Sequence, residues 1–249
     1  MKDLLKGKVA VVTGATSGIG RASAGLLASE GADIVACGRR REALEGLCSE
    51  IEAMGRRAIC AEGDGLDPEL PDRIADKASE LGGADILICS AGMALRSPSL
   101  EMSRDEWNKV LELDLSFPMF LSQLIIPQFL DKGGGRIVYI SSTAGRSVNM
   151  GASPSYGAAK AGLLYLTRHL ATEFGGRGIH VNAVCPGPVD TEITSTWTPE
   201  HRARVLSSLP MGRMGTPEDI ASIVLFLASS MSDYINGEAI LANGGRFMM

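Results

Sequence analysis

A tyrosine and a lysine stand four residues apart in the segment YGAAK, as Tyr156 and Lys160. If this segment is helical, the two side chains lie on one face of the helix. A free tyrosine hydroxyl titrates at about pH 10, too high for efficient proton transfer at neutral pH. A neighbouring ammonium stabilises the phenolate and brings that titration toward neutral pH. The spacing therefore predicts a tyrosine that works as a general acid and base beside a lysine.

A tyrosine–lysine pair alone is common on protein surfaces, so a third group is needed to support this interpretation. Ser142 ends the segment RIVYISS, fourteen residues before Tyr156. The carboxyl end of a strand is where an open α/β sheet presents its reactive groups. A serine there can donate a hydrogen bond to a substrate carbonyl and stabilise charge on its oxygen. In a strand, Ser141 and Ser142 cannot both face the same cleft.

These residues need a scaffold, and the hydrophobic pattern predicts one in which short apolar runs alternate with amphipathic ones. The predicted strands are 9–14, 33–38, 57–63, 84–92, 136–142, 179–186 and 238–245. The predicted helices are 19–30, 40–54, 68–81, 104–131, 155–175 and 217–229. Because the strand runs are continuously apolar, both of their faces are expected to be buried in a parallel sheet. The pattern predicts a doubly wound α/β fold with helices on both faces.

No linker rich in proline, glycine or serine divides the chain, so we expect one domain over residues 1–249. The segment at about 186–213 interrupts the alternation with PGPVDTEITSTW and a short polar helix. We expect it to form a substrate loop at the carboxyl edge of the sheet, where ligands bind in such folds.

Composition excludes several classes of partner. A net charge of −5 gives no reason to expect a nucleic-acid partner. The five cysteines form no C-x-x-C pair and only three histidines are present, so no metal site is expected.

Free cysteines fit a reduced, cytoplasmic setting. No apolar run approaches the ~18 residues that predict a membrane-spanning helix, so no membrane contact is expected.

A glycine-rich turn follows the first predicted strand in VAVVTGATSGIGRASA. Gly14, Gly18 and Gly20 allow a tight turn and close approach of a pyrophosphate to the start of the next helix. The spacing is T-G-x-x-x-G-x-G. Together with the serine, the Y-x-x-x-K pair and the Pro186-Gly187 step, it resembles the compact, single-domain form of the short-chain dehydrogenase/reductase family over essentially the whole chain.

The resemblance implies a Rossmann-type fold and reversible hydride transfer between a nicotinamide cofactor and a ketone or secondary alcohol. It implies that Tyr156 exchanges the proton, that Lys160 holds the nicotinamide ribose, and that Ser142, not Ser141, orients the substrate oxygen. The cofactor-binding residues that it implies are Gly14, Thr16, Ser17, Gly18, Ile19, Gly20, Arg39, Arg40, Asp64, Gly65, Ser90, Ala91, Gly92, Tyr156, Lys160, Pro186, Gly187, Val189 and Thr191.

The end of the second predicted strand bears on which nicotinamide is used. An NAD site needs a carboxylate there for the ribose 2′-hydroxyl, whereas arginine suits the 2′-phosphate of NADP. By resemblance, Gly38 stands at the position of that acid, and Arg39 and Arg40 follow it. Asp64 matches the aspartate that contacts the adenine in this family. We expect NADP(H), with NAD as the alternative.

Among family members, the chain is most similar to 3-oxoacyl carrier-protein reductases and to sugar or polyol dehydrogenases, both of which stay open. Relatives form homotetramers, which we also expect here. Lys132 and Arg177 lie near positions where carrier-protein reductases have basic residues, although either residue could equally be a solvated charge at a helix end. A different class, a non-catalytic NADP(H)-binding scaffold or sensor, would not need to retain the serine, tyrosine and lysine.

Two departures from the family pattern stand out. The usual N-N-A-G is replaced by Cys89-Ser90-Ala91-Gly92, which keeps the small residues but loses asparagine side-chain bonds. Asp114 stands where the family has an asparagine that completes a catalytic tetrad, and it falls on the apolar face of WNKVLELDLSFPMFL. A buried carboxylate needs a partner, and Lys160 is the predicted one. Its negative charge would oppose the effect of the lysine on the tyrosine and give a more alkaline optimum.

Overall fold

Seven strands form one parallel sheet in the computed structural model, which describes residues 3–248. They are β1 (Val9–Thr13), β2 (Asp33–Gly38), β3 (Ala58–Glu62), β4 (Ile86–Cys89), β5 (Gly135–Ile140), β6 (Ile179–Pro186) and β7 (Ala239–Ala242). The spatial order is β3-β2-β1-β4-β5-β6-β7, so the direction of winding reverses between β1 and β4. This confirms the predicted doubly wound α/β fold, whose ligands bind where the winding reverses.

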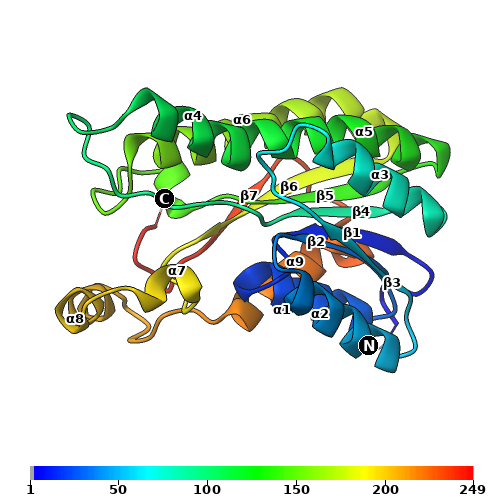
Figure 1. Cartoon of the computed structure of the whole chain (residues 1–249), viewed down its shortest axis with the longest axis horizontal. Helices are drawn as coiled ribbons and strands as arrows, with labels where there is room; N and C mark the ends of the chain where they lie inside the picture. The colour runs from blue at the N-terminus through cyan, green and yellow to red at the C-terminus, as the bar shows by residue number, and fades with distance from the viewer. Residues whose placement is uncertain (1–2, 249) are drawn as a thin grey trace.

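Helices cover both faces of the sheet, as Figure 1 shows. One layer contains α1 (Gly18–Ser29), α2 (Arg41–Ala53) and α9 (Pro217–Ala228). The other contains α3 (Leu70–Glu80), α4 (Arg104–Leu111), α5 (Phe117–Asp131) and α6 (Pro154–Phe174). In β1, Val9 and Val11 pack into one layer and Ala10 and Val12 into the other. Because each strand supplies both cores, its sequence is apolar at every position instead of at every second one.

The predicted helix 104–131 is continuous but contains one wide turn, which the sequence pattern did not predict. A π-helical segment, Glu112–Ser116, joins α4 to α5, and the Phe117 N–H donates to the carbonyl of Glu112, five residues back. Pro118 has no N–H with which to bond the carbonyl of Asp114 four residues earlier, so the α-helical ladder cannot continue there. Single π turns of this kind occur most often at functional sites.

The same helical run, Arg104–Asp131, is by length and composition able to cross a membrane, which the search for apolar runs did not indicate. Half of its most apolar window is buried inside the protein. A buried helix of the protein core has the same composition, so these features are explained by its packing against the sheet.

The predicted insertion contains two short helices instead of one, α7 (Glu192–Ser195) and α8 (Pro199–Ser207). Val205 packs with Leu209 and Met214 in a small apolar cluster of its own, against which Trp197 also packs. In Figure 1 these helices project from one end of the layered body. The insertion therefore has its own small core and is tied to the rest of the fold by the chain before and after it.

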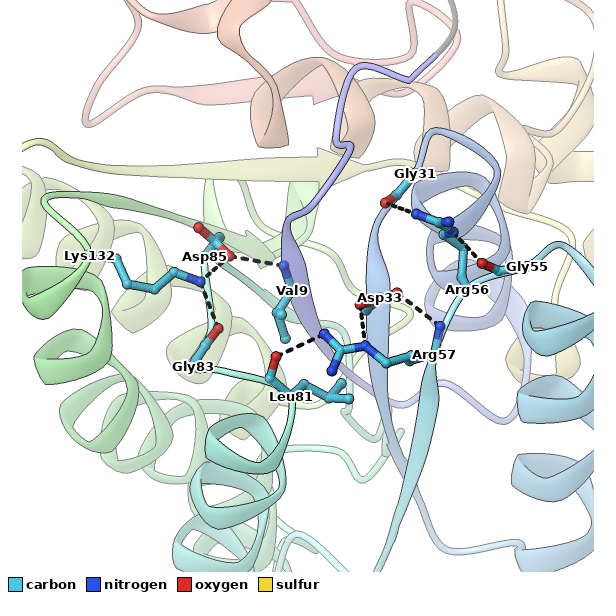
Figure 2. Close-up of polar contacts among 10 residues, drawn as sticks. All are labelled: Val9, Gly31, Asp33, Gly55, Arg56, Arg57, Leu81, Gly83, Asp85 and Lys132. Carbon is cyan, nitrogen blue, oxygen red and sulfur yellow. Dashed lines mark hydrogen bonds and ion pairs between the residues drawn. The ribbon is translucent and has the colours of Figure 1, made fainter.

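Two acidic side chains, the buried Asp85 and the partly buried Asp33, hold the strands together at the amino edge, where the strands begin (Figure 2). Asp85, 6 % exposed, accepts the backbone N–H of Val9 at 2.9 Å and binds Lys132 at 2.5 Å and Lys8 at 3.1 Å. On the neighbouring strands, Arg57 binds Asp33 at 2.7 Å and the carbonyl of Leu81 at 3.0 Å. These contacts join β1 to β4 and β2 to β3 at the edge opposite the carboxyl ends.

Removing the carboxylate of Asp85 should therefore destabilise the protein. Asp85→Ala leaves one buried backbone N–H without its acceptor and two lysines without their counter-charge, so we expect the free energy of unfolding to fall by about 2–3 kcal/mol in urea denaturation. Lys8→Met, which removes a half-exposed partner, should cost less than about 1 kcal/mol. Equal stability of Asp85→Ala and the wild-type protein would contradict this account.

Candidate active site

A cleft of about 720 Å³ lies at the carboxyl ends of the strands. It brings together residues from the loops after β1, β2, β3, β4, β5 and β6 and from the first turns of α6. Its lining includes every residue predicted for the site except Gly20: Gly14, Thr16, Ser17, Gly18, Ile19, Arg39, Arg40, Asp64, Gly65, Ser90, Ala91, Gly92, Asp114, Ser142, Tyr156, Lys160, Pro186, Gly187, Val189 and Thr191. Residues from six separate loops thus meet in one place.

The glycine-rich turn between β1 and α1 depends on close backbone packing. Gly14 has a φ of +67°, and a Cβ there would lie 2.8 Å from the N atom of Ala91. A Cβ on Gly20 would lie 2.3 Å from the carbonyl oxygen of Gly14. Gly20 therefore lets α1 approach β1 and does not line the cleft. The N-terminus of α1 opens toward the cleft at Gly18.

The side chain of Thr13 supports the loop after β4. Its Oγ1 accepts the backbone N–H groups of Ser90 and Ala91, both at 3.1 Å. Sequence reasoning missed this residue because Thr13 reads as one more β-branched residue of an apolar strand. The threonine hydroxyl thus holds the Ser90-Ala91-Gly92 backbone against the glycine-rich turn.

Positive charge surrounds the end of β2. Arg40 donates to Glu192 at 2.8 Å and to the hydroxyl of Thr16 at 3.2 Å. Arg39 lies 3.8 Å from Asp64. A Cβ on Gly38 would lie 2.6 Å from the Cγ2 atom of Thr16. A side chain at position 38 would therefore require Thr16 to move, and two guanidinium groups lie next to this position, each near an acidic side chain.

Lys160 is buried between a carboxylate and a carbonyl. Its Nζ lies 3.1 Å from Oδ2 of Asp114, donates to the carbonyl of Ile140 at 3.1 Å and lies 5.5 Å from the ring centroid of Tyr156. Burial favours the neutral amine, but the negative charges of Asp114 and of a Tyr156 phenolate outweigh it, so the pKa of Lys160 is raised. The lysine therefore stays charged, and the predicted contact with Asp114 is present.

Asp114 joins three segments through one carboxylate with no exposed surface. Its Oδ1 accepts the backbone N–H of Met93 at 2.8 Å, and its Oδ2 faces Lys160. A Cβ on Gly92 would come within 3.0 Å of Oδ2, so this glycine makes room for the carboxylate. Burial raises the pKa of Asp114, although Lys160 and the Met93 N–H act in the opposite direction.

The two serines after β5 have separate contacts. Ser141 donates to the carbonyl of Lys160 at 2.9 Å and so fastens α6 to the sheet. Ser142 accepts the N–H of Ala144 at 3.1 Å and caps the short turn Thr143–Gly145. Because Ser142 uses a lone pair in this contact, its hydroxyl hydrogen is available to an acceptor in the cleft.

The first turn of α6 fixes the position of Tyr156 in the cleft. Ser153 is the N-cap and accepts the N–H of Tyr156 at 3.3 Å, and Pro154 begins the helix. The Ser153 N–H donates to the carbonyl of Leu95 at 2.9 Å. The loop after β4 is thereby attached to the first turn of the helix that holds Tyr156, a long-range contact that no local pattern predicts.

Comparison with known proteins agrees with this geometry. The sequence profile of the family described as Enoyl-(Acyl carrier protein) reductase matches residues 14–246. The 3-oxoacyl-(acyl-carrier-protein) reductase of Escherichia coli (strain K12) is 36 % identical over 245 residues, which are 98 % of this chain and 99 % of the relative.

Two solved structures have nearly the same backbone. A short-chain type dehydrogenase/reductase from Mycobacterium marinum is 31 % identical, with a TM-score of 0.93 and coverage of 98 % of this chain and 97 % of that one. A protein described as an NAD(P)-dependent gluconate 5-dehydrogenase from Beutenbergia cavernae, with NADP bound at low occupancy, is 36 % identical, with a TM-score of 0.92 and 97 % coverage of both chains.

Proposed function

We propose that this chain, which belongs to the short-chain dehydrogenase/reductase family of oxidoreductases, transfers hydride reversibly between NADP(H) and a ketone or secondary alcohol. The observation that carries this proposal is the ammonium of Lys160, 5.5 Å from the ring of Tyr156, in a cleft at the carboxyl ends of the strands. A buried, charged lysine beside a tyrosine is the arrangement that makes the phenol an acid and base at neutral pH.

The cleft fits a dinucleotide. The glycine-rich turn presents backbone and the α1 N-terminus to a pyrophosphate, and side chains at Gly14 and Gly20 are excluded by contacts under 3.0 Å. A bound nicotinamide cofactor supplies or accepts the hydride.

The residues of the chain handle the proton and the substrate oxygen. In reduction, Tyr156 donates its hydroxyl proton to the carbonyl oxygen; in oxidation, its phenolate accepts the proton of the alcohol. Ser142 donates a hydrogen bond to the same oxygen and stabilises the charge that develops on it. Lys160 stabilises the phenolate and holds the ribose of the cofactor. Asp114 keeps the lysine charged and takes the place of the family's asparagine in the relay behind it.

NADP is supported over NAD by the end of β2. Arg39 and Arg40 lie beside Gly38, where the chain lacks the acid that an NAD site needs and where a side chain would crowd Thr16. Arginine is suited to a phosphate because its donors form two parallel bonds to the oxygens. The NADP found in the Beutenbergia relative also supports this choice.

A 3-oxoacyl thioester, free or bound to a carrier protein, is the first candidate substrate because the curated relatives are reductases of that kind. A sugar, polyol or other small secondary alcohol is the second. Lys132 contacts Asp85 and the carbonyl of Gly83 at the amino edge of the sheet. It therefore lies away from the cleft and does not support docking of a carrier protein there. Arg177 lies over the ring of Phe174, just after the end of α6 opposite to the turn that contains Tyr156, and does not line the cleft.

We further propose a single domain over residues 1–249 in which 186–213 closes over the substrate end, in a cytoplasmic homotetramer. The exposed aromatic side chains of Phe120 on α5 and Tyr165 on α6 support association through these helices. The five free cysteines support a reducing compartment.

The proposed function is tested by following NADPH and NADH oxidation with a panel of ketones and 3-oxoacyl thioesters. We expect turnover with NADPH, and a loss of about 10²–10⁴-fold in kcat for Tyr156→Phe, which removes the proton donor but keeps the ring. Tyr165→Phe, on the outer face of the same helix, serves as the matched control. Tight NADPH binding without turnover of any carbonyl would instead favour a cofactor-binding sensor or scaffold.

The cofactor preference rests on the guanidinium groups. For Arg40→Gln we expect the KM for NADPH to rise at least about tenfold and the KM for NADH to change little, because only the first cofactor has a 2′-phosphate. Arg41→Gln, which removes a neighbouring charge paired with Glu45, is the control. Equal effects of Arg40→Gln on the two cofactors would contradict this role.

Asp114 should set the pH dependence. Its carboxylate raises the pKa of Lys160, so Asp114→Asn should lower the pH at which the lysine loses its proton. In the direction of alcohol oxidation, we expect the alkaline limb of the pH–rate profile to move to lower pH by about 0.5–1 unit. Asp105→Asn, an exposed position on α4, is the control. An unchanged profile and rate for Asp114→Asn would exclude Asp114 from the relay.

A further inference from the structure

More cationic than acidic side chains line the cleft. Its acidic residues are Asp64, Asp114 and Glu192, and each lies beside a cation: Arg39 at 3.8 Å, Lys160 at 3.1 Å and Arg40 at 2.8 Å, respectively. Two further cations, Arg96 and Arg246, line the same cleft. Over residues 3–248, neither of them forms an ion pair. Within the described part of the chain, these two guanidinium groups of the cleft therefore have no counter-charge.

Arg96 is held at the substrate end by its neighbours on both sides. The carbonyl of Leu95 accepts the N–H of Ser153, three residues before Tyr156. On the other side, the hydroxyl of Ser97 donates to the carboxylate of Glu106 at 2.9 Å. The same carboxylate also takes part in the capping box at the start of α4. These contacts place Arg96 beside the first turn of α6 and away from the α1 N-terminus, where the cofactor phosphates are expected.

The guanidinium of Arg96 also packs on the substrate insertion. It lies 5.8 Å from the ring centroid of Trp197, and that ring also packs edge-on against His201 at 4.8 Å. The indole Nε1 of Trp197 is buried, and no acceptor for it exists among the protein groups in the described part of the chain. Trp197 and His201 both line the cleft. The exposed guanidinium of Arg96 thus lies over an indole ring whose own N–H has no acceptor in the described part of the chain.

We propose that Arg96, with Arg246 and the indole N–H of Trp197, forms a subsite for an oxyanion on the substrate: a carboxylate or a phosphate group attached to the ketone that Tyr156 reduces. The guanidinium fork binds both kinds of oxyanion through paired hydrogen bonds, and the aromatic ring beneath it restricts its orientation. The proposal rests on the proposed function, because it assigns the substrate class of the same site.

The test compares matched anionic and neutral ketones with NADPH. The first pairs are 4-oxopentanoate and 5-oxohexanoate against their methyl esters; the second pair is 3-oxobutanoyl phosphopantetheine against 3-oxobutanoyl pantetheine. For the wild-type protein we expect kcat/KM to be about 10- to 100-fold higher for the anion in at least one pair, mainly through KM. A preference in the first pairs identifies a carboxylate, and one in the second pair a phosphate.

Arg96→Met should abolish this preference, because it keeps a long side chain on the indole ring but removes the charge. Arg96→Lys should retain part of it. Arg204→Met removes a cation from the exposed side of α8, outside the cleft, and should leave the preference as it is in the wild-type protein. Equal kcat/KM for anion and ester in every pair, or an undiminished preference in Arg96→Met, would overturn the proposal.

A binding measurement separates this proposal from the proposed function. With Trp107→Phe as the background, Trp197 is the remaining tryptophan of the two in the chain and reports directly on the subsite. We expect pentanoate, added to the NADPH complex, to change the fluorescence of Trp197 in a saturable way. Pentanamide should bind at least tenfold more weakly, and the Arg96→Met variant should show no response to pentanoate. Absence of reduction with all ketones would contradict the proposed function alone, whereas absence of any anion-dependent signal, from pentanoate or from phosphopantetheine, would contradict the subsite.

Discussion

A buried ion pair between Lys160 and Asp114 holds the candidate site together. Burying an ammonium group costs free energy. The carboxylate of Asp114 and the carbonyl of Ile140, each 3.1 Å from the Lys160 Nζ, offset this cost. The partners come from four places: α6, the wide turn between α4 and α5, the end of β5, and the loop after β4 through Met93. Lys160 is therefore the point at which the end of β5, α6, the wide turn between α4 and α5 and the loop after β4 are joined.

This pair belongs to a series of charges along the cleft. Arg39 and Arg40 stand at the end of β2, Lys160 in the middle, and Arg96 and Arg246 at the other end, while three acids neutralise only part of this charge. The chain as a whole has a net charge of −5. A cationic cleft in an acidic protein concentrates the field where a phosphate-bearing cofactor enters, and it leaves the outer surface repulsive to polyanions such as nucleic acids.

Much of this arrangement follows from local patterns. The strands are recognisable because each supplies two cores, and their predicted boundaries differ from the observed ones by a few residues at most. The cost of a buried carboxylate predicted that Asp114 needs a partner, and the resemblance to the family pattern implied Lys160 as that partner. The π turn was not predicted, because it depends on one missing N–H at Pro118 within an otherwise regular apolar face. Arg96, Trp197 and Arg246 were not predicted to converge, since they are brought together by the fold from three distant segments.

The close contact between Gly38 and Thr16 has a consequence for how cofactor use can change. An aspartate at position 38 would suit NAD, yet its Cβ would lie 2.6 Å from the Cγ2 atom of Thr16. Serine at position 16 lacks that methyl group but keeps the hydroxyl that binds Arg40. Thr16→Ser removes the methyl group that a Cβ at position 38 would contact, whereas Gly38→Asp alone requires the Thr16 side chain to move. An acid at position 38 is therefore accommodated more easily when the serine substitution at position 16 comes first.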